Sequence, residues 1–275
     1  VRFVLPLFVI SLLIGAIGMV GYQYLSEEVR RETHRTLAVI AEQKRQQIED
    51  SLAEARIDAE LYFSRHSPLE TLLAQWLASG RRNDAILTKM QVRMAEVARV
   101  RGWGGLAVLD ARGRAVFTIG KADAGPHARL IEDILRQPRT ELVDLQRNAD
   151  GAAQYGFLAP IGEAGAAPIG VAYLTWQAEQ NLYPLVESWP VPTHTAETYL
   201  VRRDGDGVRF LTPLRHHKDA ALNLTQPLST PDMPAARAAK GEHGILSGGR
   251  DYRRVPVLAY VAAVAGTPWL MIAEI

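Results

Sequence analysis

Residues 154–162 read QYGFLAPIG, and residues 256–264, about one hundred positions later, read PVLAYVAAV. The segments that follow them, PIGVAYLTW at 168–176 and TPWLMIAEI at 267–275, align with each other at a similar offset. All four are short, apolar and bounded by Gly or Pro, a pattern that is typical of strands. Two strands that recur in the same order at a fixed offset predict two related modules in tandem.

Each module is also predicted to begin with a hairpin and a short helix. In the first, strands at 106–110 and 114–119 flank the turn sequence Asp110-Ala111-Arg112-Gly113, and a helix follows over 127–137. The second repeats this order with strands at 199–203 and 208–211, the turn at 204–207 and a helix at 233–239. The predicted class is α+β, with two antiparallel sheets of five or six strands and helices against their faces.

The chain begins with an apolar segment that carries no charged residue from Phe3 to Val20 and is closed by Ser26-Glu27-Glu28. About 20 apolar residues at a rise of 1.5 Å cross a hydrocarbon layer of roughly 30 Å. We therefore predict a transmembrane helix over residues 1–25. A cleaved signal peptide is the alternative, but it has a shorter apolar stretch and a cleavage site that GMVGYQYL at 18–25 does not provide.

A second helical segment is predicted directly after the apolar one, over residues 26–66, because no Pro or Gly interrupts it. Apolar residues recur there at spacings of three and four, with an interruption at Lys44. The stripe consists of Leu37, Ala41, Ile48, Leu52, Ala55, Ala59 and Tyr62. We expect this helix to leave the membrane, to pair with a second copy as a homodimer, and to pack on the modules. An amphipathic helix on a monomer is the alternative.

The two modules are predicted over residues 67–190 and 191–275. A helix around 178–188 and the linker Trp189-Pro190-Val191-Pro192 join them. The 31 basic and 30 acidic side chains nearly cancel, so no charge surplus points to nucleic acid. The chain has no cysteine, which excludes disulfides, thiolate metal sites and a cysteine nucleophile.

An anchor, a long helix and two tandem sheet modules resemble the double Cache sensors, the extracytoplasmic, PAS-like ligand-binding domains of bacterial transmembrane receptors. The likeness is most specific in VRFLTPLRHHKDAAL at 208–222 and in the segment 248–275. This second module resembles the membrane-proximal module that precedes histidine kinases and diguanylate cyclases. The resemblance implies a bacterial inner-membrane protein with residues from about 26 onward in the periplasm. It also implies that this segment is not itself an enzyme, although a kinase or cyclase output could follow it.

The family usually holds a small-molecule ligand in its membrane-distal module, between the sheet and the overlying helices. The amino-acid-binding subgroup carries an Arg-x-Trp-Tyr segment, which the nearest sequence here, Arg101-Gly102-Trp103-Gly104, lacks. Amino-acid recognition is therefore not carried over. Aromatic walls and a few orienting polar groups make a pocket, and the candidates are Trp103, Asp144, Arg147, Tyr155, Phe157, Tyr173, Thr175 and Trp176.

Strand alternation divides these candidates between two faces of the distal sheet. Tyr155 and Phe157 share a face, Tyr173 and Thr175 share a face, and Trp176 points away from the latter pair. Asp144 and Arg147 could bind the amine or carboxylate of a ligand. The alternative for the aromatic residues is core packing, and for the two charged residues a solvated surface.

Other site chemistries find little support in the sequence. His216 and His217 are adjacent, so on a strand they face opposite ways and make a poor metal site. No nucleophile-elbow, zinc-protease or phosphate-loop motif occurs, and no cofactor is expected. The predicted function is ligand sensing in a transmembrane receptor. The alternative is a ligandless tethered domain for dimerisation or protein interaction, whose distal interior Tyr155, Phe157 and Tyr173 would fill.

Overall fold

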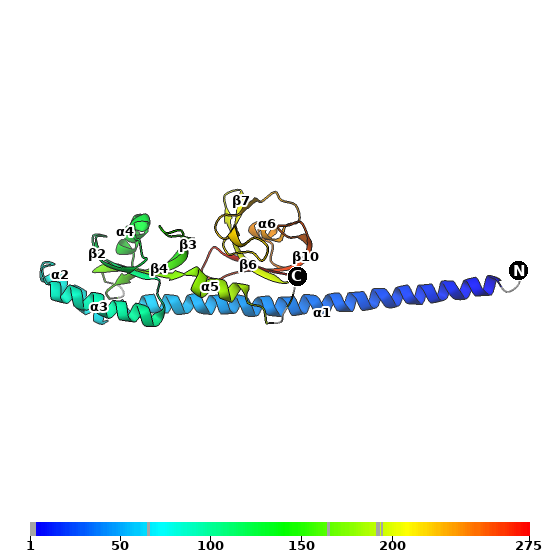
Figure 1. The fold of residues 1–275 in the computed structure, drawn as a ribbon, viewed down its shortest axis with the longest axis horizontal. Helices are drawn as coiled ribbons and strands as arrows, with labels where there is room; N and C mark the ends of the chain where they lie inside the picture. Colours follow the sequence, from blue (N-terminus) through cyan, green and yellow to red (C-terminus); the bar gives the residue numbers. More distant parts are fainter. Residues whose placement is uncertain (1–3, 65–66, 164–165, 191–192, 194) are drawn as a thin grey trace.

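The computed structural model describes residues 4–64, 67–163, 166–190, 193 and 195–275, and it gives no side-chain description for residues 4–16, Val20 and Ser26. The chain forms a long helix, α1 (Val4–Leu61), followed by two antiparallel sheets. Both sheet modules lie along the C-terminal half of α1, and its N-terminal half extends beyond them (Figure 1). The predicted α+β architecture with two tandem modules is confirmed.

The transmembrane helix predicted over residues 1–25 falls mostly on positions whose side chains lie outside this description. Among the helical residues that are described, none belongs to a stretch with the length and apolar character needed to span a membrane. The backbone of this region is helical from Val4 onward and continuous with the rest of α1.

The predicted apolar stripe of α1 is buried from Leu37 to Ala59. It packs against the two sheets of the same chain, so intramolecular contacts already cover this face of the helix. The helix ends at Leu61 rather than continuing to residue 66. The chain leaves the helical path there because Phe63 is fully buried and its carbonyl oxygen accepts a hydrogen bond from the Gly162 N–H at 3.2 Å.

Two capped helices connect α1 to the first sheet. In α2 (Pro68–Ala78) the Ser67 side chain accepts a hydrogen bond from the Glu70 N–H and so caps the helix. The Asn83 side chain caps α3 (Asp84–Arg101) in the same way. Gly102, at a φ of 68°, ends α3 in the left-handed conformation that glycine adopts without steric cost.

The sheet of the first module, here called the distal sheet, has the strand order β2-β1-β5-β4-β3. Its strands are β1 (Gly105–Asp110), β2 (Ala115–Gly120), β3 (Glu141–Arg147), β4 (Ala153–Ile161) and β5 (Gly170–Gln177). One face packs on α1, and the other is covered by η1 (Gly125–His127) and α4 (Ala128–Arg136). This sheet therefore has a helix layer on each side.

The sheet of the second module, here called the proximal sheet, has the order β8-β7-β6-β11-β10-β9. After the edge strand β8, its five strands follow the order of the distal sheet. Its strands are β6 (Glu197–Asp204), β7 (Gly207–Phe210), β8 (Thr225–Pro227), β9 (Gly244–Arg250), β10 (Pro256–Ala263) and β11 (Leu270–Glu274). The pairs β4–β5 and β10–β11 coincide with the aligned sequence segments, so the predicted repeat is confirmed. The short helices η2 (Lys218–Ala220) and α6 (Pro234–Ala239) complete this module, and α5 (Ala178–Glu187) joins the two modules. The exact boundaries proposed for the modules stay a prediction.

Candidate ligand-binding site

The face of the distal sheet that lies away from α1 carries the candidate site. One row of cross-strand neighbours runs across it, through Thr118, Ala107, Tyr173 and Leu158. Directly paired residues of an antiparallel sheet project from the same face. The row therefore places Tyr173 beside the small side chain of Ala107, on the face that η1 and α4 cover.

A cavity of about 350 Å³ lies between this face and α4. Its walls are mostly small side chains, which leave the space between sheet and helix unfilled. They come from the sheet, the first hairpin, the loop before η1, and α4: Ala107, Leu109, Arg112, Gly113, Ala115, Thr118, Ala122, Asp123, Ala124, Gly125, Ala128, Ile131 and Glu132. A second hollow, of about 340 Å³, shares Thr118, Ala122 and Asp123 with it and extends toward Asp150.

A buried polar cluster around Tyr173 lies on the same face of the sheet as the cavity. The Tyr173 hydroxyl is fully buried and has no hydrogen-bond partner at normal geometry. Its ring lies over Gly156, where an added Cβ would come within 2.7 Å of the ring. The His127 ring meets the Tyr173 ring edge-on at 5.2 Å, and its Nε2 lies 3.0 Å from the Gln146 side-chain nitrogen. His127 and Gln146 are therefore in hydrogen-bonding contact, and the Tyr173 hydroxyl is the group of this cluster that lacks a partner at normal geometry.

Burial shifts the titration of both rings toward their neutral forms. It raises the pKa of Tyr173 to about 12, although the nearby Gln146 and Gln154 side chains oppose the shift. It also lowers the pKa of His127 below its usual value, with the Asp123 carboxylate acting in the opposite direction. At neutral pH the cluster therefore presents a neutral phenol and a largely neutral imidazole.

Charge at the cavity comes from Asp123, Glu132 and Arg112. Asp123 lies in the loop before η1, where its Oδ1 accepts a hydrogen bond from the Gly125 N–H at 2.9 Å. Asp123, Thr118 and His127 are not among the site residues predicted from the sequence. The sequence feature that could have indicated Asp123 is the short segment Lys121–Pro126, which connects a predicted strand to a predicted helix. Loops of this kind often carry binding residues.

Four of the predicted site residues lie on the opposite face, against α1. Tyr155 pairs directly with Trp176 across β4 and β5, and their rings stack at 6.0 Å. Phe157 meets Trp176 edge-on at 6.1 Å, and the Trp103 indole N–H donates to Asp58 on α1 at 3.1 Å. The predicted division into faces is confirmed by this register. Thr175 shares the face of Tyr173, and its hydroxyl donates to the Lys121 carbonyl oxygen at 3.0 Å.

The two predicted charged residues lie at the junction between the modules. Asp144 forms an ion pair with Arg202 and accepts a hydrogen bond from the Trp269 indole at 2.6 Å. The Arg147 guanidinium donates to the Ala221 carbonyl oxygen at 2.8 Å. Both residues thus connect the distal sheet to the proximal module, and neither is among the residues that line the cavity at α4. Their role in ligand binding stays a prediction.

Comparison with solved structures shows which proteins share this arrangement. The extracellular domain of a protein described as histidine kinase soHK1S-Z6 is 15% identical, with a TM-score of 0.58 over 92% of this chain and 96% of that one. The ligand-binding domain of the Pseudomonas aeruginosa amino-acid chemoreceptor PctB, in complex with L-Arg, is 16% identical, with a TM-score of 0.56 over 89% and 95%. A domain from Vibrio parahaemolyticus, described as belonging to a sensory box/GGDEF family protein, is 14% identical, with a TM-score of 0.57 over 90% and 96%.

These likenesses show the fold, because the sequence identities are low. Chemoreceptor, kinase and GGDEF sensor domains all match over nearly their whole length. No family model matches this chain, and no curated protein does. The chain has the fold of the extracytoplasmic sensor domains of bacterial receptors, and the predicted double Cache architecture is confirmed.

Proposed function

We propose that this chain is the periplasmic sensing region of a bacterial inner-membrane receptor, and that a small organic molecule binds in the distal module. The cavity between β1, β2 and α4 carries the proposal. Its volume, about 350 Å³, lies within the range of roughly 300–1,000 Å³ that small-molecule pockets occupy. Tyr173 projects from the same face of the sheet as its cross-strand partner Ala107, which lines the cavity.

We further propose that the ligand carries a protonated amine. Asp123 and Glu132 place two carboxylates at the cavity, against the single guanidinium of Arg112. An ammonium group makes charge-assisted hydrogen bonds to carboxylates, which are stronger than neutral ones. Structural neighbours were solved with such molecules, namely L-Arg in PctB, GABA in PctC and L-serine in CtaA.

The signal would pass from the distal module through α1 and the membrane segment to an output domain, for which a histidine kinase and a diguanylate cyclase are the candidates. Since the buried stripe of α1 packs on the chain's own sheets, a homodimer would use the opposite side of the helix. Val39, Ile57 and Leu61 are more than half exposed there. They lie close to whole numbers of turns apart, so they share one side of α1.

Binding can be tested by titration calorimetry on the full chain with a panel of amino acids and simple primary amines, and with the matched carboxylic acids lacking the amine. We expect at least one amine to bind, and Asp123→Asn to weaken it by at least about tenfold, which corresponds to about 1.4 kcal/mol. The matched control is Asp133→Asn on α4. Asp133 pairs with the Arg139 guanidinium at 2.5 Å and does not line the cavity.

The outcomes separate the proposal from its alternatives. Binding of carboxylic acids without amines would contradict the ligand class but keep the sensing role. Equal loss in both variants would show that Asp123 does not contact the ligand. If nothing in a broad metabolite panel binds, the ligandless domain for dimerisation or protein interaction becomes the better explanation.

A further inference from the structure

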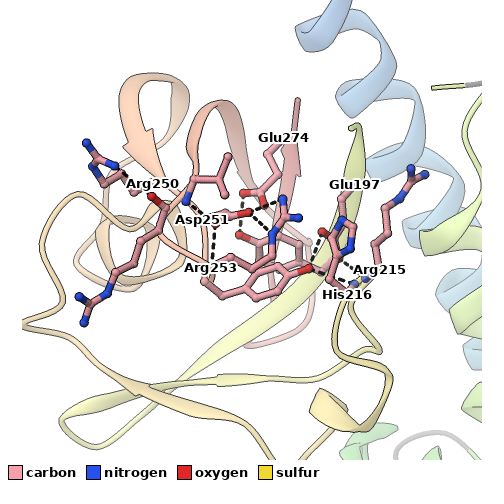
Figure 2. A network of polar contacts seen from close by, with 11 residues as sticks. Glu197, Arg215, His216, Arg250, Asp251, Arg253 and Glu274 are labelled. Carbon is pink, nitrogen blue, oxygen red and sulfur yellow. Dashed lines mark hydrogen bonds and ion pairs between the residues drawn. The ribbon is translucent and has the colours of Figure 1, made fainter. Parts of the chain in front are cut away.

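The proximal module contains two buried carboxylates that face each other across a pair of strands. Glu197 on β6 and Glu274 on β11 are direct antiparallel partners, so their side chains project from the same face. Glu197 is 6% exposed and Glu274 is 2% exposed. Figure 2 shows them in one polar network with Arg215, His216, Asp251 and Arg253. Side chains paired in this way have Cβ atoms about 4.5–5.5 Å apart.

The hydrogen bonds around the pair come from uncharged donors. Glu197 accepts from the Arg215 backbone N–H at 2.5 Å and from the Tyr252 hydroxyl at 3.0 Å. Glu274 accepts from the Tyr199 hydroxyl at 2.9 Å. Within the described part of the chain, neither glutamate forms an ion pair with a lysine, arginine or histidine.

The charged groups that face the pair do not neutralise it. Arg253 binds Asp251, a third buried carboxylate, through its Nε at 2.7 Å, so its charge is already matched. The guanidinium of Arg215 donates to the Thr193 carbonyl oxygen. His216 donates its backbone N–H to Tyr252. Burial, the largest influence, raises the pKa of Glu197, whereas the His216 imidazole lowers it. Lys218 and Glu187 line a small hollow with Glu197 and pair with each other at 4.0 Å. Tyr199 and Tyr252 are neutral phenols at physiological pH.

Two buried carboxylates that are direct cross-strand partners do not both stay ionised, because desolvation and mutual repulsion act together. We propose that Glu197 and Glu274 share one proton at neutral pH, and that release of this proton makes the proximal module a sensor of periplasmic pH. This function is independent of the ligand proposed for the distal module. It gives the proximal module a sensory role of its own, since the proposed ligand binds only in the distal module.

The electrostatic environment supports this assignment. Burial raises the pKa of Glu274 to about 8, with Glu197 and Asp251 adding to the shift and the Tyr199 hydrogen bond opposing it. Burial also raises the pKa of Glu197 above its usual value. The shift of Glu274 is the larger one, so the proton resides mainly on this carboxyl, and the charge of Glu197 helps to retain it.

The position of the pair connects it to α1. Glu274 is the last residue of β11, and the alternate residues Met271 and Ala273 belong to the core that packs on α1. Ionisation of both carboxylates would push β6 and β11 apart at this end of the ladder. This repulsion would therefore act on β11, the strand whose other face packs on α1.

The sign of the stability change follows from linkage. Between about pH 4.5 and about pH 8 the folded chain holds a proton that the unfolded chain has released, so stability falls as pH rises through this window. We expect the melting temperature of the full chain to fall by roughly 3–8 °C more in the wild type than in Glu274→Gln between about pH 5 and about pH 8. Glu242→Gln is the matched control, since Glu242 lies in the same module and pairs at the surface with Arg237.

Infrared spectroscopy provides a second measurement that does not depend on unfolding. At pH 7 the wild type and Glu242→Gln should both show the carbonyl stretch of a protonated, buried carboxyl. Glu274→Gln should lack it at pH 7. Glu197→Gln should lose it at a lower pH than the wild type, because removing the repulsion leaves burial as the main cause of the raised Glu274 pKa. A wild type without this band, or single variants that both retain it, would overturn the proposal. A wild-type pH dependence equal to that of Glu274→Gln would do the same.

Discussion

Lys44 places an ammonium group inside the interface between α1 and α5. Its side chain is 3% exposed, and its Nζ donates to the Leu185 and Val186 carbonyl oxygens at 2.9 and 3.1 Å. These carbonyls belong to the last turn of α5, where a cation interacts favourably with the helix dipole. Burial lowers the pKa of Lys44 to about 8 because no carboxylate compensates its charge. The residue thus fixes α1 to the helix that joins the modules.

This pKa predicts a pH dependence for Lys44→Met. Between about pH 8 and about pH 10.5 the unfolded chain keeps a proton that the folded chain releases, so wild-type stability rises with pH. Relative to Lys44→Met, we expect the wild type to gain roughly 1–3 kcal/mol across this window in urea unfolding. Lys89→Met, which removes an exposed ammonium group from α3, is the control. Identical pH slopes in wild type and Lys44→Met would refute this account.

The sequence shows that Lys44 interrupts the apolar stripe, but it does not show why. The reason is non-local, since the acceptors on α5 lie more than 140 positions further along the chain. The same limit applies to Asp144 and Arg147. Their charge and their place near the distal sheet were visible in the sequence, whereas their contacts with Arg202, Trp269 and Ala221 depend on how the modules dock.

At the scale of the elements, the C-terminal end of α1 organises the entry into the distal sheet. Asp58 is 5% exposed and binds the Arg101 guanidinium through two hydrogen bonds, one of them at 2.9 Å from Nε. It also accepts from the indole of Trp103, whose ring meets Tyr62 edge-on at 5.3 Å. One carboxylate therefore ties α1 to the end of α3 and to the start of β1.

Asp58→Asn should destabilise the chain by about 2 kcal/mol. The change removes the charge from a mostly buried carboxylate with three donors, and hydrogen bonds to charged groups contribute about 1.5–3 kcal/mol. The measurement is the free energy of unfolding in urea. Glu60→Gln is the matched control two residues further along α1, because Glu60 forms an exposed pair with Arg56, and it should cost less than about 0.5 kcal/mol. Equal costs for the two variants would contradict the role given to Asp58.

Local pattern predicted most of the elements, but not which layer covers which face. Alternation correctly separates Tyr155 and Phe157 from Tyr173 and Thr175. It cannot say that α1 covers the first pair and α4 the second, because that choice depends on contacts between distant segments. The cavity itself was missed for the same reason. It arises where small residues such as Ala107 and Ala115 meet the loop around Asp123, and no single segment shows that meeting.

At the scale of the whole molecule, the two modules are joined by a polar and aromatic junction as well as by α1. Asp144 on β3 binds Arg202 on β6 and the indole of Trp269, and the Trp269 ring meets Tyr155 edge-on at 6.3 Å. The Ala265 N–H donates to Glu49 of α1 at 2.7 Å. These contacts join the distal sheet directly to the proximal one and to α1.

A double-mutant cycle tests this junction. Asp144→Asn and Arg202→Met should couple by about 1–2 kcal/mol in the free energy of unfolding, because the pair is partly buried and shares Trp269. The control cycle is Asp204→Asn with Arg209→Met, a more exposed pair within the proximal hairpin, which should couple by less than about 0.5 kcal/mol. A coupling near zero at the junction would show that these two side chains act independently.

The tandem organisation was visible in the sequence because both modules repeat one strand order at a nearly constant offset. The different interiors of the two modules were not visible in the sequence. The distal sheet keeps a cavity under α4, whereas the proximal module packs the alanine-rich α6 closely and buries charged residues at its last strand. Similar topology thus accommodates different interiors, and these depend on side-chain size and pairing rather than on strand order.

The unbroken backbone of α1 has a mechanical consequence. Val4 and Leu37, the first residue of its buried stripe, are 33 positions apart, a distance of about 50 Å along the helix axis. If the modules turn this rod by one degree about Leu37, its far end moves by about 0.9 Å. Small rotations at the sheets, which barely disturb side-chain packing, therefore become displacements at Val4 that approach the size of an atom.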